Sequence, residues 1–170
     1  MGAAQVLPLV ALAALLHEIG HLLVLRLFGV YVEGIYFTSF GAEIRADTRF
    51  LPYWKDIACT VAGPGMNLLA ALLLSRLAGD YLLAGANLLQ GCFNLLPLTG
   101  LDGSRTLHLL ISWLFGPVCA DRIFRIVEII CVLLMAVCAL YLVIYCGTGF
   151  FLMIALIGIF VSIWRDMRAK

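Results

Sequence analysis

VLPLVALAALLHEIGHLLVLRLF, residues 6–28, is an apolar run that carries two histidines and a glutamate near its middle. As a helix rising about 1.5 Å per residue, the run is long enough to cross a hydrocarbon layer of about 30 Å. An ionisable side chain in the middle of a membrane helix costs on the order of 3 kcal/mol on insertion scales, so it is a functional candidate by default. The run therefore predicts a transmembrane helix that carries a functional site.

The spacing of the three ionisable residues indicates a metal site. His17 and His21 are four residues apart, so a helix presents both imidazoles on one face, one turn from each other. Glu18 is rotated by about 100° from His17 and can border the open side of a metal without being a ligand. This is the H-E-x-x-H arrangement of zinc hydrolases. We therefore expect one Zn²⁺ per chain, with His17 and His21 as ligands and Glu18 as general base.

The composition predicts an integral membrane protein. Of the 170 residues, 64% are hydrophobic and 12% are charged, whereas a soluble domain averages roughly 45–50% apolar and 25% charged residues. The formal net charge of +1 gives no case for nucleic-acid binding. No basic stretch precedes the first apolar run, which argues against a cleaved secretory signal. The six cysteines form no CxxC pair, and we interpret them as small buried hydrophobes rather than a disulfide framework.

The sequence predicts an all-α polytopic membrane protein with about five transmembrane segments and a small β-hairpin near the membrane surface after the first. The segments are expected at residues 6–28, 53–77, 81–96, 123–145 and 149–164. Residues 30–47 are rich in β-branched and aromatic residues around Ser39-Phe40-Gly41, which favours the hairpin. The segment at 81–96 is short for a full crossing, and a second helical stretch at 104–115 is expected to continue from it after a break at Pro97. Such an interrupted helix is expected where the backbone lines a site rather than lipid. We expect one domain over residues 1–170, with its core at 6–117 and additional helices at 118–170.

The basic residues predict the orientation in the membrane. With five crossings, ten of the eleven lysines and arginines fall on one side, and Arg76 falls on the other. By the positive-inside rule, the N-terminus then lies outside and the C-terminus lies in the cytoplasm. We expect the chain in a bacterial cell membrane, with the histidines toward the cytoplasmic side.

Two histidines do not complete a catalytic zinc site, which usually has three protein ligands and a water. Asp102 is the leading candidate for the third ligand because it follows the break at Pro97 and precedes Gly103, which lets the backbone turn closely. His108, about a turn and a half further along the chain, is the rival ligand. We favour Asp102 because two imidazoles and a carboxylate form a familiar catalytic zinc set.

Three motifs make the chain resemble the site-2 proteases, which are membrane-embedded zinc metalloproteases of the M50 class. Residues 17–21, HEIGH, resemble the zinc-binding helix of that family. Residues 94–103, NLLPLTGLDG, resemble its NxxPxxxxDG motif, with Asp102 in the third-ligand position, and residues 62–67, AGPGMN, resemble its GPxxN signature. The resemblance covers residues 6–117 and looks closest to compact bacterial members such as the stage IV sporulation protein FB group.

The resemblance implies three helices around zinc and hydrolysis of peptide bonds in membrane-anchored protein substrates, within or near the lipid bilayer. It also implies that the hairpin pairs with extended substrate, and a regulatory membrane protein is a further expected partner. Asn94, Pro97, Asn67 and Gly103 are expected to bind substrate or to support the site. For Asn94 both roles are equally open, whereas Asn67 is more simply a hydrogen-bonding group between helices.

Two other functions compete with proteolysis. A catalytically silent scaffold built on a protease core would not need Glu18. A metal transporter would use histidine and aspartate along an ion path, but transporters usually show paired repeats and polar residues through the full depth of the membrane. Here the polar residues cluster at one depth, which favours a single site.

Overall fold

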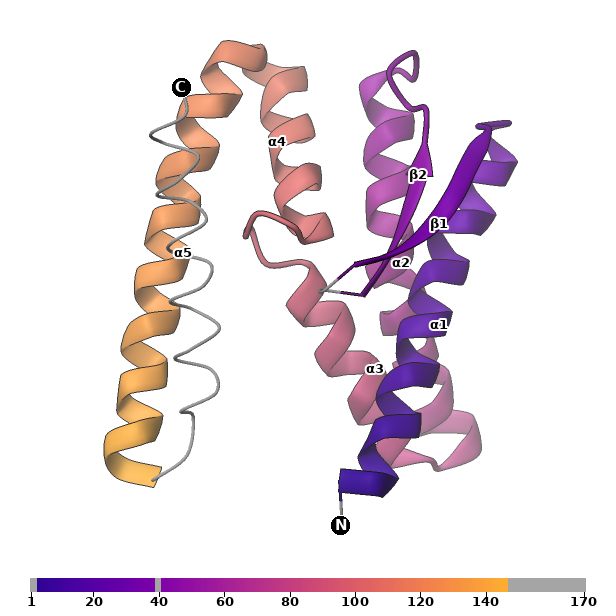
Figure 1. The fold of residues 1–170 in the computed structure, drawn as a ribbon, viewed down its shortest axis with the longest axis vertical. Helices are drawn as coiled ribbons and strands as arrows, with labels where there is room; N and C mark the ends of the chain where they lie inside the picture. Colours follow the sequence, from indigo (N-terminus) through magenta and orange to yellow (C-terminus); the bar gives the residue numbers. More distant parts are fainter. Residues whose placement is uncertain (1–2, 39–40, 147–170) are drawn as a thin grey trace.

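The computed structural model describes residues 3–38 and 41–146 as five α-helices, one π-helical turn and a two-stranded sheet (Figure 1). The helices are α1 (Ala3–Leu27), α2 (Tyr53–Leu73), α3 (Tyr81–Asn94), α4 (Asp102–Phe115) and α5 (Pro117–Cys146), and the π-helical turn η1 (Leu74–Ala78) extends α2. The strands are β1 (Val32–Thr38) and β2 (Gly41–Ala46). The expected last span at 149–164 lies outside the described residues, as does Ser39-Phe40 of the expected hairpin.

Three helical stretches of the described chain are long and apolar enough to cross a membrane. They are Val6–Leu27 in α1, Tyr53–Ala78 in α2 and η1, and Pro117–Tyr145 in α5. Their outer surfaces are apolar: on α5, the side chains of Leu133, Leu134 and Val137 are each more than half exposed. Such a continuous apolar exterior needs lipid around it. The chain is therefore an integral membrane protein.

The third passage through the molecule is an interrupted helix, as the sequence predicts from the short segment at 81–96 and the helical stretch at 104–115. α3 and α4 contain 14 residues each, which is about 21 Å of helix and too short to cross a membrane alone. Figure 1 shows the two helices following one another along the long axis of the molecule. Helix cannot continue between them because Pro97 lacks a backbone N–H and disfavours helical geometry at the preceding residue. The helix expected at 104–115 is thus the second half of one discontinuous passage.

The hairpin follows α1, as the sequence predicts. β1 and β2 pair antiparallel, with Ile35 opposite Ile44 and Thr38 opposite Gly41. The register shifts between Val32 and Gly34, which is a β-bulge. β2 contacts α1, and Figure 1 shows the hairpin running back alongside the helices instead of projecting away from them. A strand with a free edge is thereby placed next to the helix that carries the histidines.

α2 lies in close contact with both α1 and α3 because small residues line the interfaces. A Cβ added at Gly20 would lie 2.5 Å from the carbonyl oxygen of Ala62 and 2.8 Å from Met66 Cβ, both on α2. On α3, a Cβ at Gly91 would lie 3.2 Å from Asn67 Cβ. Glycine lets the backbones of membrane helices approach in this way. The close approach allows side chains of α2 to reach the histidines.

α5 packs on α4 and on the break that precedes it. Leu98, in the break, is fully buried against Val132 of α5, and partly buried apolar side chains surround this pair: Leu96, Leu101, Cys131 and Met135. α4 also packs against α2. α4 therefore lies between α2 and α5, and the break is supported from the α5 side.

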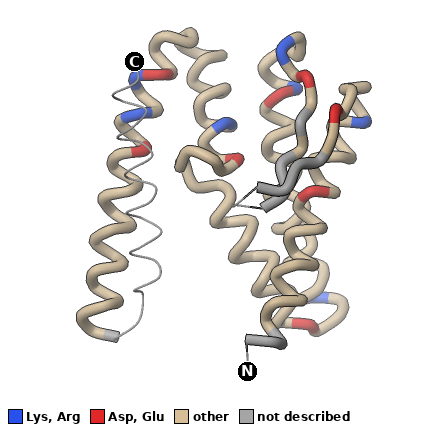
Figure 2. The backbone as a smooth tube through the Cα atoms, in the orientation of Figure 1, with Lys and Arg blue, Asp and Glu red and all other residues tan. Residues whose placement is uncertain are grey.

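Charged residues gather toward one end of the described structure. Figure 2 shows the blue and red segments mainly in the half of the molecule that holds the C-terminal end of α1 and the connection between α4 and α5. The opposite end carries Arg76 in η1 and Asp80 before α3. This asymmetry agrees with the distribution of basic residues along the sequence.

The cysteines are less buried than expected. Among the five that the structure describes, Cys59 is buried and Cys131 is partly buried, whereas Cys92, Cys119 and Cys138 are exposed on helix surfaces. All five are free thiols. A free cysteine behaves as a small hydrophobic residue, so it can lie on the apolar exterior of the helices as well as in a protein core.

Candidate metal centre

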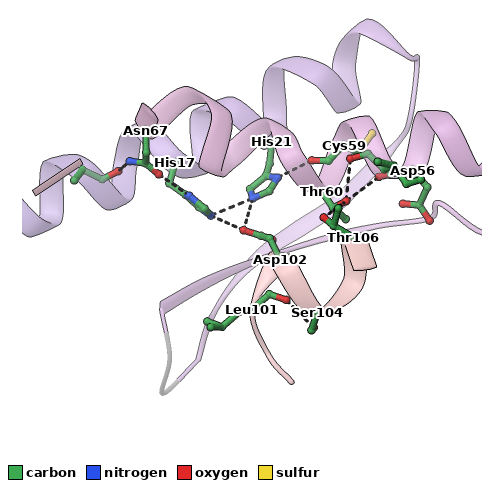
Figure 3. A network of polar contacts seen from close by, with 12 residues as sticks. His17, His21, Asp56, Cys59, Thr60, Asn67, Leu101, Asp102, Ser104 and Thr106 are labelled. Carbon is green, nitrogen blue, oxygen red and sulfur yellow. Dashed lines mark hydrogen bonds and ion pairs between the residues drawn. The ribbon is translucent and has the colours of Figure 1, made fainter. Parts of the chain in front are cut away.

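His17, His21 and Asp102 converge on one point (Figure 3). Asp102 Oδ2 lies 2.9 Å from His17 Nε2 and 3.3 Å from His21 Nε2, and the two Nε2 atoms are 3.1 Å apart. The histidines come from α1 and the aspartate begins α4, so the break in the third passage brings the carboxylate to the histidine pair. His108 lies elsewhere, with its Nε2 2.9 Å from Asp121 Oδ1. Of the two rival third ligands, the fold brings Asp102 to the histidines.

Asn67 determines which nitrogen of His17 carries a hydrogen. The amide nitrogen of Asn67 donates to the carbonyl oxygen of Ala13 and to Asn87 Oδ1, both at 2.9 Å. Asn87 is fixed in turn because its own amide nitrogen donates to the carbonyl oxygen of Leu83 at 2.9 Å. Asn67 Oδ1 is therefore an acceptor, and it receives the Nδ1–H of His17 at 2.7 Å. The Nε2 atom of His17 is left with a free lone pair.

His21 is fixed in the same tautomer by a backbone group. Its Nδ1 lies 2.8 Å from the carbonyl oxygen of Cys59, which can only accept, so Nδ1 carries the hydrogen. Both Nε2 atoms then face each other and the carboxylate of Asp102 as acceptors. Three acceptors this close repel one another unless a cation lies between them, and two imidazoles with one carboxylate are a usual set for catalytic zinc. The donor chemistry therefore fits a zinc ion, and the partners on the outer nitrogens are those that zinc-binding histidines require.

Gly63 of α2 lies directly against the two imidazoles. A Cβ at this position would overlap His21 Nε2 and would lie 2.8 Å from His17 Cε1. A glycine is needed here because any larger side chain would fill the space between the two imidazoles. Gly63 is thus a packing residue whose neighbours are the side chains of the site itself.

The backbone around Asp102 is tightly held. A Cβ at Gly103 would overlap the backbone carbonyl of Leu95, so the start of α4 packs directly on the end of α3. The carbonyl oxygen of Leu101 accepts from the N–H of Ser104 at 3.1 Å and from its hydroxyl at 2.7 Å. Asp102 is thereby placed in the first turn of α4, where the helix dipole favours a negative charge.

A cavity of about 600 Å³ opens beside the three converging side chains. Glu18 lines it together with both histidines and Asp102, and Asn94 of α3 lines it as well. Ile44 and Ala46 of β2 form part of its wall, and both belong to the same face of the strand. Asn67, Pro97 and Gly103, the other expected supporting residues, do not line the cavity. Asn67 instead bonds to His17, Gly103 packs against Leu95, and Pro97 lies in the break between α3 and α4.

Gln90 is a cavity residue that sequence reasoning missed. It lies on α3, four residues before Asn94 and so on the same face of the helix. Its side-chain oxygen is buried and has no hydrogen-bond partner within the described part of the chain. The helical spacing to Asn94 is the signal that could have identified it.

A second polar link joins α2 to α4 at the edge of the cavity. Arg105 donates to Asp56 Oδ1 at 2.8 Å and to Thr48 Oγ1 at 2.6 Å. The hydroxyl of Thr106 donates to that of Thr60 at 2.9 Å. Asp56 is buried inside a helix of spanning length, and the guanidinium gives that carboxylate its partner. These contacts hold the body of α4 in place beside the histidines.

Comparisons with known proteins found similarity in sequence and in fold. Residues 5–80 match the model of Peptidase family M50. The chain is 28% identical over 119 residues to the zinc metalloprotease MJ0392 of Methanocaldococcus jannaschii, a match that covers 64% of this chain and 34% of that protein. The chain thus spans about a third of the length of this curated relative.

The solved structure of a site-2 protease from Methanocaldococcus jannaschii superposes with a TM-score of 0.63 at 22% sequence identity. The match covers 94% of this chain and 76% of that one. The chain therefore has the fold of a site-2 protease, and its segment from residue 5 to residue 80 is similar to Peptidase family M50.

Proposed function

We propose that the chain is an intramembrane zinc metalloprotease that hydrolyses peptide bonds of membrane-anchored protein substrates within or near the bilayer. The observation that carries the proposal is the set of three acceptor atoms of His17, His21 and Asp102 with Glu18 in the same cavity. Metal binding alone would not need that glutamate, and hydrolysis does. The match to Peptidase family M50 supports the same chemistry.

In this proposal His17 Nε2, His21 Nε2 and the Asp102 carboxylate hold the zinc. Bound zinc would supply a Lewis acid that polarises a carbonyl oxygen and makes a water a better nucleophile at neutral pH. The Glu18 carboxylate takes the proton from the attacking water and later gives it to the leaving amide nitrogen. Asn67 and the carbonyl of Cys59 keep both imidazoles in the tautomer that presents Nε2.

The cavity suits an unwound peptide. A transmembrane helix hides its amide groups in internal hydrogen bonds, so a substrate must become extended before a carbonyl can be attacked. An extended segment then has free N–H groups, and the buried oxygen of Gln90 is an acceptor without a partner among the described residues. Asn94, on the same face of α3, can both donate and accept. The free edge of the hairpin would add the substrate as a further strand.

We propose further that the N-terminus lies outside and the C-terminus in the cytoplasm, with the site toward the cytoplasmic side. The unequal distribution of basic residues supports this orientation. A bacterial source and a likeness to the stage IV sporulation protein FB group, with a regulatory membrane protein as partner, rest on the motif resemblance. The curated relative found by comparison comes from Methanocaldococcus jannaschii.

Replacing Glu18 by glutamine tests the proposal. Wild-type chain and Glu18→Gln are reconstituted in liposomes with a model substrate of one transmembrane helix, and cleavage is followed by mass spectrometry. Loss of a general base should slow cleavage by about 10²–10⁴-fold while zinc content stays at the wild-type value. Asp80→Asn is the matched control, because it also removes one carboxylate but keeps the capping oxygen, at the far end of the molecule from the site.

Unchanged cleavage by Glu18→Gln would refute the proposed mechanism. No cleavage by the wild-type chain, with zinc bound, would instead favour the silent scaffold. Transport of Zn²⁺ across the liposome membrane without cleavage would favour the transporter.

A further inference from the structure

Glu128 is a buried acid in the longest apolar helix of the described chain. It lies in α5, and its side chain is 5% exposed. Its Oε1 accepts a hydrogen bond from the backbone N–H of Thr99 at 2.7 Å. Placing a carboxyl group inside a membrane-spanning helix costs free energy, so such a residue is a functional candidate. The protease chemistry proposed above does not use it, and Glu128 does not line the cavity of the site.

The partner of Glu128 belongs to the break between α3 and α4. Within the break, the N–H of Leu98 bonds to the carbonyl of Leu96 at 2.8 Å, and that of Leu101 bonds to the carbonyl of Leu98 at 3.0 Å. The N–H of Thr99 lies between them and bonds to the carboxyl of Glu128 instead of a carbonyl. Lipid offers no hydrogen bonds, so a backbone group exposed by a broken helix must find a partner in the protein.

The position of Thr99 is transmitted to Asp102, three residues further on. The turn closed by Leu101 N–H and Leu98 carbonyl joins the two residues, and Ser104 closes the next turn on the carbonyl of Leu101. Gly100 adopts a φ of +95°, a conformation that a larger side chain rarely takes. Successive hydrogen-bonded turns therefore connect Thr99 to Asp102.

α5 holds the break at two neighbouring points. Glu128 binds its backbone, and Val132, one helical turn further along α5, packs against the fully buried Leu98. α2 holds the body of α4 through Arg105 and Thr106, on the other side. The segment that precedes Asp102 is therefore supported by α5.

We propose that Glu128 is a positioning residue for the metal centre. Through the N–H of Thr99 it sets the break so that Asp102 meets the two histidines. This inference rests on the proposed zinc site, and it makes no use of peptide hydrolysis. What matters is an acceptor oxygen at the right reach, rather than a negative charge near the site.

Zinc affinity tests the proposal in the purified full chain. The dissociation constant for Zn²⁺ is measured by competition with a chelator, and the visible absorption of bound Co²⁺ reports the ligand geometry. Glu128→Leu should weaken Zn²⁺ binding by roughly 10–100-fold, as is usual for loss of a group that orients a ligand. Glu128→Gln keeps an acceptor at the same reach and should bind within a few-fold of wild type. Glu128→Asp keeps the charge but shortens the reach, and it should bind more weakly than Glu128→Gln.

A double-mutant cycle separates positioning from general damage to the fold. If Glu128 acts through Asp102, then Glu128→Leu should weaken Zn²⁺ binding much less when it is added to Asp102→Asn. An equal loss in both backgrounds would overturn the proposal, as would wild-type affinity in Glu128→Leu. If Glu128→Leu does not fold, the Zn²⁺ affinities of Glu128→Gln and Glu128→Asp are compared instead. Tighter Zn²⁺ binding by Glu128→Asp would overturn the proposal, because it would mean that the negative charge is required.

The outcome is independent of proteolysis. If the wild-type chain binds zinc but cleaves no substrate, the proposed function fails while the Zn²⁺ series still decides the role of Glu128. If the wild-type chain cleaves substrate and the Zn²⁺ affinity of Glu128→Leu is unchanged, only the role of Glu128 fails.

Discussion

Replacing Asn67 by leucine tests how the protein keeps His17 ready for a metal. Asn67 accepts the Nδ1–H of His17 at 2.7 Å and donates to Ala13 and Asn87 at 2.9 Å. Leucine makes none of these bonds, so His17 becomes free to carry its hydrogen on Nε2, the atom that faces Asp102. Loss of such an outer partner costs roughly 10–100-fold in metal affinity, which is about 1.4–2.7 kcal/mol.

Asn67→Asp distinguishes the effect of Asn67 on the tautomer of His17 from its effect on the stability of the helix bundle. An aspartate at this position still offers an oxygen to the Nδ1–H of His17, so zinc affinity should stay near the wild-type value. It has no hydrogen to donate to the carbonyl of Ala13 or to Asn87 Oδ1, and it places acceptors against acceptors. Two lost hydrogen bonds of about 1 kcal/mol each lower the free energy of unfolding by about 2 kcal/mol.

Two measurements on the detergent-solubilised chain decide the matter: Zn²⁺ competition titration and denaturant unfolding without metal. Asn67→Leu should lose both affinity and stability, and Asn67→Asp should lose stability alone. Asn87→Leu is the control, because it removes the bond to Asn67 without touching His17, and its zinc affinity should be close to wild type. Equal losses of zinc affinity in Asn67→Asp and Asn67→Leu would refute the tautomer argument.

Two further predictions concern single positions around the site. Gly63→Ala should abolish zinc binding because its methyl group would overlap His21. The control is Gly65→Ala, which should bind zinc normally because no atom lies within 4 Å of its added Cβ. Normal zinc binding by Gly63→Ala would mean that α1 and α2 separate easily. Gln90→Leu should keep the free energy of unfolding at or above the wild-type value, because it removes a buried oxygen that has no partner in the described structure. Its kcat/KM should fall about tenfold, the equivalent of one hydrogen bond of about 1.4 kcal/mol to the substrate. Cys92→Leu, on the same helix but outside the cavity, is the control, and an unchanged kcat/KM in Gln90→Leu would remove Gln90 from substrate binding.

Local spacing was enough to predict the part of the site that lies on one helix. The four-residue separation of His17 and His21 places both on one helical face whatever the rest of the fold does. The choice of Asp102 over His108 also followed from the sequence, since a proline and a glycine around the aspartate indicate a break where the backbone can turn inward. The structure brings Asp102 to the histidines and pairs His108 with Asp121.

The partners of these residues could not be predicted because they depend on which helices meet. The acceptor for His21 is a backbone carbonyl at Cys59, and no side-chain pattern reveals which carbonyl a helix will offer. The bond between Glu128 and Thr99 could not be predicted either, because it joins residues 29 positions apart. The interrupted third passage, by contrast, was predicted from the sequence, because the apolar run at 81–96 is short for a full crossing and stops at Pro97.

The discontinuous third passage has a consequence for how the protein is made. Neither α3 nor α4 has the length of an independently inserting segment, and the break between them is polar backbone that lipid does not accept. A nascent chain that ends before α5 would thus carry both histidines and Asp102, but the N–H of Thr99 would lack its partner and Leu98 would lack its cover. Synthesis of α5 supplies Glu128 and Val132 to that break. With Glu128 in the positioning role proposed above, the metal centre is completed only after α5 has been synthesised.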